Sequence, residues 1–478
     1  MLDRRAFLGL SAAALAGAAV PDRPLHAEPP DQQGDDDLPP SIRALQSMAD
    51  RAAPITVEER LARIAKARRL MGMYNLDAVM LTGGTTMDYY TNVRWGLSER
   101  LFAIVMPAAG RPFVVTPAFE EDRTREQLDG GPLGETDTAV LTWQEDEDPY
   151  VLVADGLRDR GIATGRLGIE ETVRFLFSDG VARAAPALSL TSATPVTAGC
   201  RGVKTEHELE LMRLASRVTL AAYEATYRAL EEGMTQQRVG ELLRIAHRRL
   251  GFSGSAGVQT GGYTTLPHGS VTPQEIREGT ILLIDGGCAV EGFRSDISRT
   301  FVLGNPTARM REVFDVVLAA QTAALRAAAP GVPCEAVDRA ARRVIADAGY
   351  GDDYTYFTHR VGHGIGMDGH EWPYLVRGNT LPLEPGMTFS DEPGIYLPGE
   401  FGVRLEDDMV TTEDGAELLT PQSPSLDDPF GDMESGETWG TGGREPSSGF
   451  QPLVRVGGRA PLYRVESGGV PVSSEPAT

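Results

Sequence analysis

Two aspartates in one short stretch of the chain are the first residues whose spacing suggests chemistry. Asp285 follows the apolar residues 281–284, and Asp296 lies further along the same stretch. A β-hairpin centred on Val290 and Glu291 would place the two side chains opposite each other, with β-carbons about 5 Å apart. Carboxylates at that distance repel unless a cation lies between them, so the pair predicts a metal site. The alternative is that one aspartate is a solvated turn residue, which the apolar residues before Asp285 argue against.

A second pair of acidic residues repeats this arrangement. Glu392 and Glu406 are equally far in sequence from Gly399, which lies in the turn-like segment Pro398-Gly399-Glu400. If a turn forms there, the two glutamates also face each other. Four carboxylates in one cavity are stable only with bound cations, and two divalent ions would balance their charge.

A histidine-rich segment offers a nitrogen ligand for the same site. Four of the seven histidines lie between His268 and His370, and His363 stands within Gly-His-Gly-Ile-Gly. One nitrogen donor among carboxylates favours transition metals such as manganese, iron or cobalt over calcium. Two of the other histidines have simpler interpretations: His268 taken alone would be an ordinary loop residue, and His359 would donate from a loop to the backbone.

The order of these residues, with the motifs around them, resembles one known family. The ordered set lies within Gly-His-Gly-Ile-Gly, His-Glu-x-Pro, Glu-Pro-Gly and Arg-x-Glu-Asp, and consists of Asp285, Asp296, His363, Glu392 and Glu406. The pattern is similar to the pita-bread metallopeptidases, specifically the prolidase and aminopeptidase P group, over residues 55–427. The resemblance implies an α/β fold class, in which a creatinase-like N-terminal α/β domain precedes a pita-bread (creatinase/aminopeptidase) catalytic domain.

The resemblance also implies a metal-binding role for each member of the set. Asp296 and Glu406 would bridge two divalent metal ions, Asp285 would complete one coordination sphere, and His363 and Glu392 would complete the other. The ions would activate a water molecule and polarise the scissile carbonyl. Manganese is the favoured metal, with cobalt, iron and zinc as alternatives.

Catalytic roles follow from the same resemblance. Glu392 would double as general base and later proton donor. His268 and His370 match substrate-contacting histidines, which would hydrogen-bond the tetrahedral intermediate or shuttle its proton. Arg404 would anchor the last ligand carboxylate or the substrate. Asp391 departs from the family's usual apolar residue before Glu392, but adjacent strand residues point to opposite faces, so the ligand is expected to be intact.

The implied reaction is hydrolysis of the bond between an N-terminal residue and proline in a short peptide. The sequence leaves open whether dipeptides or longer peptides are preferred. One alternative is a creatinase-like C–N hydrolase, whose relatives lack several of the metal ligands. Another is a non-catalytic peptide-binding module, which would also be expected to have lost ligands. The large first domain argues against a methionine aminopeptidase, and in relatives it helps to form a homodimer.

The elements that must position these residues divide into two domains. Residues 55–198 begin with a Thr-x-x-Glu capping box at Thr56 and interleave helices with short apolar strands, as an α/β domain does. A second capping box at Thr205 opens the catalytic domain, residues 199–427, in which helices are expected at 307–329 and 335–348 and strands around the acidic pairs. Residues 28–54 are predicted to be a linker, and residues 428–478 a disordered tail rich in Gly, Ser and Pro.

Charge and the N-terminus suggest where the protein works. The formal net charge of −23 repels phosphate backbones, so we expect no nucleic-acid partner. Arg4-Arg5, the apolar residues 6–20 and a small-residue cleavage site ending at Ala27 resemble a twin-arginine export signal over residues 1–27, which implies a periplasmic or extracellular protein. The apolar run is too short to span a bilayer. The cysteines have no metal-type spacing and are expected to be buried thiols.

Overall fold

The computed structural model describes residues 37–134 and 138–431. The predicted export signal, the first part of the predicted linker and most of the predicted tail lie outside these residues. Among the described residues, no helix combines the length and the apolar character needed to cross a membrane.

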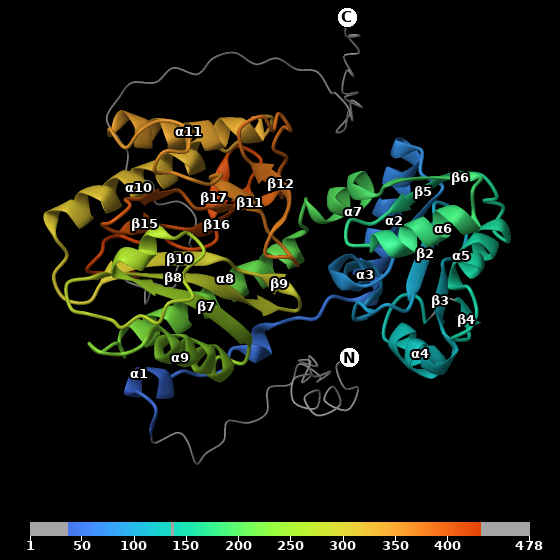
Figure 1. The fold of residues 1–478 in the computed structure, drawn as a ribbon, viewed down its shortest axis with the longest axis horizontal. Helices are drawn as coiled ribbons and strands as arrows, with labels where there is room; N and C mark the ends of the chain where they lie inside the picture. Colours follow the sequence, from blue (N-terminus) through green and yellow to red (C-terminus); the bar gives the residue numbers. More distant parts are fainter. Residues whose placement is uncertain (1–36, 135–137, 432–478) are drawn as a thin grey trace, which may run out of the picture. The chain divides into compact units, whose positions relative to one another are not determined.

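The first domain is built on a mixed six-stranded sheet in the order β4-β3-β2-β1-β5-β6 (Figure 1). Its strands are β1 (Ala78–Leu81), β2 (Ala103–Pro107), β3 (Phe113–Pro117), β4 (Ala139–Trp143), β5 (Gly165–Ile169) and β6 (Leu188–Ser192). Its helices are α2 (Val57–Tyr74), α3 (Gly84–Thr91), α4 (Glu121–Asp129), α5 (Pro149–Arg158), α6 (Phe175–Ala184) and α7 (Thr194–Arg201). The apolar runs predict β1, β2, β3 and β5, whereas β4 and β6 were not predicted.

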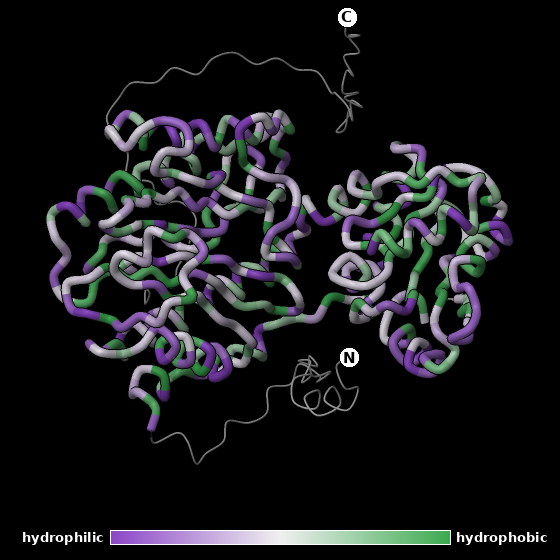
Figure 2. Tube along the Cα trace, in the orientation of Figure 1, coloured by the Kyte–Doolittle hydropathy of each residue, from purple (hydrophilic) through white to green (hydrophobic). Residues whose placement is uncertain are grey.

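Helices cover both faces of this sheet because successive strand residues point in opposite directions. Val79 and Leu81 of β1 belong to the cluster that contains residues of α2, α3 and α7. Ala78 and Met80 of the same strand belong to the cluster with residues of α5 and α6. The hydropathy colouring accordingly shows hydrophobic strands, whereas α4 is largely hydrophilic (Figure 2).

Part of the predicted linker is ordered and packed. Helix α1 (Pro40–Arg43) and a 3-10 turn (Ala49–Arg51) lie within it. Ile42 is fully buried, and Ser41 Oγ donates to Ala225 O at 2.7 Å. The described part of residues 28–54 is therefore not a loose arm, because its apolar residues pack on the catalytic domain's first two helices.

The start of the predicted tail is also packed. The Phe430 side chain is only 6% exposed, and its ring centroid lies 5.6 Å from that of Tyr227. The predicted start of the tail at residue 428 is thus a few residues too early. Phe430 packs against Tyr227 although the residues around it are polar.

The catalytic domain contains two sheets, a separate two-stranded ladder and four long helices. The first sheet has the order β10-β8-β7, with β9 paired to β8, and the second the order β12-β11-β13-β16-β17. The strands are β7 (Ser253–Thr260), β8 (Ile281–Val290), β9 (Phe293–Arg294), β10 (Ile297–Val302), β11 (Gly362–Gly364), β12 (Glu371–Leu375), β13 (Thr388–Asp391), β14 (Gly394–Tyr396), β15 (Gly402–Arg404), β16 (Asp407–Thr411) and β17 (Ala416–Leu418).

Helices α8 (Glu206–Tyr227) and α9 (Gln236–Arg249) pack on the first sheet, and α10 (Ala308–Ala327) and α11 (Cys334–Asp347) on the second (Figure 1). The capping boxes predicted at Thr56 and Thr205 are both present. The predicted helices at 307–329 and 335–348 correspond to α10 and α11.

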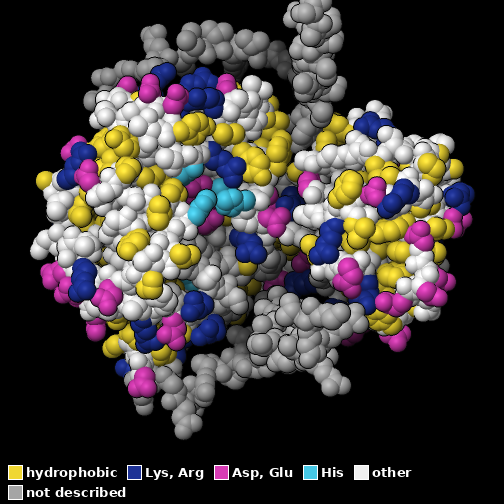
Figure 3. Space-filling view, in the orientation of Figure 1, with side chains coloured by type: hydrophobic (Ala, Val, Ile, Leu, Met, Phe, Trp, Pro, Cys, Tyr) yellow, Lys and Arg dark blue, Asp and Glu magenta, His cyan; other side chains and the backbone are white. Residues whose placement is uncertain are grey.

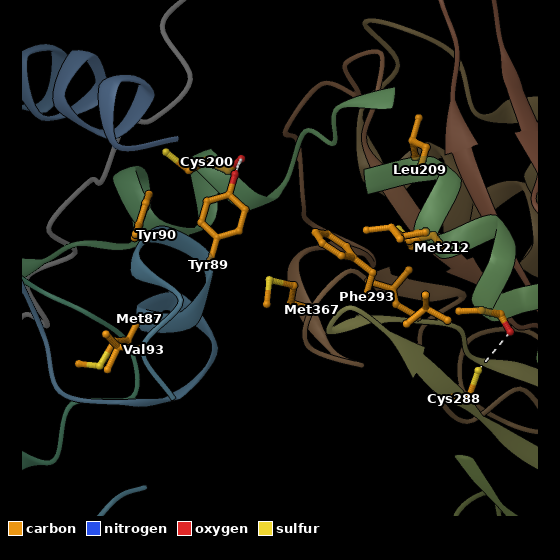
Figure 4. Packing of buried hydrophobic residues seen from close by; sticks show 14 of the residues in the cluster. Met87, Tyr89, Tyr90, Val93, Cys200, Leu209, Met212, Cys288, Phe293 and Met367 are labelled. Carbon is orange, nitrogen blue, oxygen red and sulfur yellow. Dashed lines mark hydrogen bonds between the residues drawn. The ribbon is translucent and has the colours of Figure 1, made fainter. Parts of the chain in front are cut away.

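The three cysteines are free and buried, as predicted. Figure 4 shows Cys200 beside Tyr89, whose hydroxyl donates to the Cys200 carbonyl at 3.2 Å. In the same view Cys288 directs its Sγ towards Ala215 O, at 3.3 Å. These thiols fill core positions and lie apart from the acidic residues.

The hairpin that carries Asp285 has a different register from the one predicted. Glu291 and Gly292 form its turn, with positive φ values of 48° and 87°, as a two-residue type I′ turn requires. Asp285 is therefore paired with Ser298 and not with Asp296. The prediction centred the turn one residue too early. The partner changes by two residues, so Asp296 stays on the same side of the sheet as Asp285.

The second hairpin has the predicted register. Gly394 pairs with Arg404 across β14 and β15, and Asp391 pairs with Asp407 across β13 and β16. The two ladders continue one register, with a gap between them. Glu392 directly follows β13 and Glu406 directly precedes β16, so both lie in this gap. They consequently face each other.

Candidate metal centre

The predicted acidic residues and the predicted histidine ligand converge on one cavity of about 370 Å³. Its lining includes Asp285, Asp296, His363, Glu392 and Glu406, together with His268, His359, Arg360, His370 and Arg404. In the space-filling view, histidine side chains gather with acidic and basic side chains on one face of the catalytic domain (Figure 3). Every site residue predicted from the sequence therefore lies at this cavity.

Within the cavity, the donor atoms form compact groups of three that share members. Asp285, Asp296 and Glu406 can each offer an atom within 4.8 Å of the others, and so can His363, Glu392 and Glu406. Glu406 belongs to both trios. A third group contains Asp296, His363 and His370. Two adjacent metal positions with a common carboxylate fit this arrangement.

Without bound cations, burial disfavours the ionised form of these carboxylates. Burial and the neighbouring Asp285 and Glu392 carboxylates raise the pKa of Asp296 well above its usual value. Burial and the Asp296 carboxylate do the same to the pKa of Glu406. Burial raises the pKa of Glu392 to about 7, although the Arg404 guanidinium opposes the rise. Each group would lose this penalty beside a bound cation.

Asp285 differs because it has a permanent cationic partner. Burial alone would raise its pKa, but the Arg404 guanidinium and the Ser298 hydroxyl lower it overall. Arg404 Nη2 lies 2.6 Å from Asp285 Oδ2, whereas Arg404 Nε lies 3.9 Å from Glu406 Oε2. The arginine beside the last predicted ligand thus makes its short ion pair with the first acidic residue of the set.

His363 is held as a neutral imidazole that directs one nitrogen to the carboxylates. Burial, reinforced by His370, lowers its pKa to about 3. Its Nδ1 lies 3.1 Å from the Gly364 carbonyl, which makes Nδ1 the protonated nitrogen. Its Nε2 lies 3.3 Å from Glu392 Oε1 and 4.0 Å from Asp296 Oδ2. A neutral ring with a fixed tautomer is the form that binds a metal.

The other three histidines of residues 268–370 border the same space. The His370 ring stacks on His363 with centroids 3.8 Å apart. His268 lies on an exposed loop at the cavity. His359 bonds the Arg360 carbonyl at 2.8 Å, in line with the simple interpretation of this residue, but its other nitrogen lies 2.7 Å from the Tyr396 hydroxyl.

Three residues of the site were given no functional role from the sequence. Ser298 lies between two of the carboxylates and contacts both. Tyr396 accepts from Arg404 at 3.1 Å. Arg360 lines the cavity and places its guanidinium 4.2 Å from the Tyr374 ring centroid. Ser298 could have been found from strand alternation, since it stands two residues after Asp296; the other two are positioned by tertiary contacts.

Asp391, the departure noted before Glu392, lies behind the site. Its side chain is fully buried, and neither carboxylate oxygen has a hydrogen-bond partner among the described residues. Burial and the Asp407 carboxylate raise its pKa well above the usual value. It is absent from the cavity lining. As predicted from the alternation of strand residues, Asp391 lies off the cavity that Glu392 lines.

The donor set as a whole fits divalent metal ions. It combines carboxylate oxygens with one neutral imidazole nitrogen, which is the chemistry that manganese, iron, cobalt and zinc accept. Among the described residues of the lining, Arg404 and Arg360 are the only Lys or Arg side chains that can offset the repulsion among Asp296, Glu392 and Glu406. Divalent cations would balance the remaining negative charge.

Comparison with known proteins agrees with this geometry. The model of metallopeptidase family M24 matches residues 210–413, and that of the creatinase/prolidase N-terminal domain matches residues 63–203. A probable dipeptidase PepE of Mycobacterium tuberculosis is 37% identical over 74% of this chain and 92% of its own length. A Xaa-Pro dipeptidase of Lactobacillus helveticus is 34% identical over 74% of this chain and 95% of its own.

A solved structure extends the likeness to the fold. The crystal structure of dipeptidase PepE from Mycobacterium ulcerans has a TM-score of 0.73 and 33% identity, and covers 78% of this chain and 99% of its own. Both halves of the described chain thus match one architecture, and the buried acidic cluster lies in the half that matches the peptidase model. The chain belongs to metallopeptidase family M24 and carries a creatinase/prolidase N-terminal domain before its catalytic domain.

Proposed function

We propose that this metallopeptidase hydrolyses the bond between an N-terminal residue and proline in dipeptides. It would use two divalent metal ions, of which manganese is the favoured one. The observation that carries the proposal is the pair of donor trios that share Glu406. The names of relatives, such as Xaa-Pro dipeptidase and prolidase, support the choice of substrate. The complete donor set argues against the creatinase-like and the non-catalytic alternatives.

The metals would supply an activated water molecule and a Lewis acid for the scissile carbonyl. The protein's own residues supply proton transfer and orientation. Glu392, which lines the cavity beside His363, would accept a proton from that water molecule and return it to the leaving group. His370 and His268, both exposed at the cavity, are placed to hydrogen-bond the substrate. The ion pair of Arg404 with Asp285 holds one carboxylate in place.

Arg360 favours a dipeptide over a longer peptide. Its Nη2 lies 3.4 Å from His370 Nδ1, and no carboxylate among the described residues forms an ion pair with it. A dipeptide places its C-terminal carboxylate one residue beyond the scissile bond, where a cation at the cavity can pair with it. A longer peptide has a neutral peptide group at that position.

We also propose that the protein is exported through the twin-arginine-like signal of residues 1–27 and acts as a homodimer outside the cytoplasm. The Arg4-Arg5 pair and the apolar run support export. Recovery of a periplasmic or secreted chain beginning at Glu28, with a mass in solution twice that of the chain, is the expected result. Retention of the uncleaved chain in the cytoplasm would contradict the first part, and a monomer the second.

Peptidase activity is tested with purified protein on Xaa-Pro dipeptides, longer Xaa-Pro peptides and matched peptides with alanine in place of proline. We expect metal-dependent cleavage of Xaa-Pro dipeptides above all others. Asp296→Asn should reduce turnover to background and lower the metal stoichiometry, because it removes a carboxylate of two donor groups. Equal, metal-independent rates on all peptides, or no cleavage with any metal, would reject the proposed function.

The stability of the metal-free protein should fall as pH rises from 6.5 to 8.5. Burial raises the pKa values of Asp296, Glu406, Asp391 and Asp408 well above their usual range, so the folded state binds protons that the unfolded state has lost. Each such proton costs about 1.4 kcal/mol of stability per pH unit. Histidines with lowered pKa values act in the opposite direction, but only below about pH 6.5, their unfolded pKa.

Thermal unfolding in a chelator and in saturating Mn²⁺ measures this effect. Manganese should raise Tm and flatten its pH dependence, because cations take over the role of protons at Asp296 and Glu406. Asp391→Asn is the matched control, since it removes a buried acid outside the cavity and should leave the manganese effect intact. A metal-free Tm that is constant or rises over this pH range would contradict the electrostatic account.

The role of Arg360 is tested by comparing a Xaa-Pro dipeptide with its C-terminal amide. Arg360→Met should lower kcat/KM for the free dipeptide by about 10- to 100-fold, the value of a charge-assisted hydrogen bond, with little change for the amide. Arg377→Met is the control, because Arg377 is exposed and pairs with Asp353 away from the cavity lining. An equal loss on both substrates would show that Arg360 does not recognise the carboxylate.

A further inference from the structure

Ser298 lies where three strands of the site meet. It is the ladder partner of Asp285 in the first hairpin, and it forms an isolated β-bridge with Glu406 of the second. Its side chain is fully buried. Ser298 is thus the backbone position at which the two acid-bearing hairpins are joined.

The Ser298 hydroxyl contacts three charged groups at once. Its Oγ lies 2.8 Å from Asp285 Oδ1 and 2.6 Å from Glu406 Oε2. Arg404 Nε donates to the same oxygen at 2.9 Å. A hydroxyl has a single proton and two lone pairs, so it can accept from Arg404 while it donates to one carboxylate at a time. The short Oγ distance to Glu406 favours that carboxylate as the acceptor.

This contact fixes the one carboxylate that both donor trios require. Glu406 is common to the trio with Asp285 and Asp296 and the trio with His363 and Glu392. A glutamate side chain has three rotatable bonds, and a hydrogen bond to one of its oxygens holds the other in a defined direction. Asp285 is held by its ion pair with Arg404 at Oδ2, and its Oδ1 lies 2.8 Å from the same Ser298 oxygen.

We propose that Ser298 is a positioning residue of the metal centre, whose hydroxyl accepts from Arg404 and donates to Glu406, and so orients Glu406 beside Asp285 to serve both metal positions. The inference rests on the metal centre and not on the choice of peptide substrate. Groups that orient metal ligands in this way commonly govern metal affinity by about 10- to 100-fold. A purely structural role would depend on the volume of the side chain and not on its ability to donate.

The experiment titrates Mn²⁺ into the full-length metal-free protein and records the visible spectrum of the Co²⁺-loaded form, for Ser298→Ala and Ser298→Thr. The threonine variant keeps the hydroxyl donor. We expect Ser298→Ala to bind at least one of the two ions about 10- to 100-fold more weakly and to show an altered Co²⁺ spectrum, and Ser298→Thr to stay close to the wild type in both. Ser216→Ala is the matched control, because Ser216 is also fully buried but bonds only the Met212 carbonyl of its own helix.

The outcomes separate the two roles without any peptidase assay. Wild-type manganese affinity and an unchanged Co²⁺ spectrum in Ser298→Ala would overturn the proposal, because that variant has no hydroxyl. If Ser298→Ala fails to fold, the threonine variant decides: a loss of affinity of about 10- to 100-fold despite its hydroxyl would overturn the proposal. A loss of affinity in Ser216→Ala equal to that in Ser298→Ala would also overturn the proposal, since it would show a general effect of removing a buried hydroxyl.

Discussion

Repulsion among buried carboxylates around Glu406 is the constraint on which the catalytic half of the chain depends. Burial raises the pKa values of Glu406 and Asp296 well above the usual range, so their anionic forms are unfavourable without cations. The fold nevertheless brings both together: Asp296 immediately precedes β10, and an isolated β-bridge joins Glu406 to Ser298 of the same strand. Cations that bind between the hairpins would therefore stabilise the folded state, so metal binding and folding stability become linked.

Behind the cavity, a buried carboxylate is neutralised by an arginine side chain of the protein itself. Arg299 Nη2 pairs with Asp407 Oδ1 at 2.7 Å, and Arg299 Nη1 bonds the Glu406 carbonyl at 2.9 Å. Arg299 and Asp407 are both almost completely buried. A buried pair is costly to break once formed, because the remaining charge would be left without a partner. A permanent cation thus fixes the strand that carries Glu406, while the layer in front of it is left for exchangeable ions.

The sequence predicted the convergence of the site better than its detailed pairing. The register of Glu392 and Glu406 could be predicted because Gly399 marks a turn midway between them. The pairing of Asp285 was predicted wrongly because a Glu-Gly turn carries no strong signal, and a shift by one residue changed its partner to Ser298. The prediction that Asp285 and Asp296 lie on the same side of the sheet was still correct, since the strand partner of Asp285 moved by two residues. Arg360 was out of reach, because its place at the cavity depends on stacking over Tyr374.

Arg404 shows why the metal side and the substrate side of such a cavity cannot be treated as independent. Along β15 and the residues just after it, alternation sends Val403 and Leu405 into the core and leaves Arg404 on the side of the cavity with Glu406. Its guanidinium pairs with Asp285 and also donates to the Pro267 carbonyl at 2.9 Å. Pro267 immediately precedes His268 on the loop at the cavity's edge. One side chain therefore sets the position of an acidic residue and of the loop that would meet the peptide, so a change in one is transmitted to the other through a single rigid planar group.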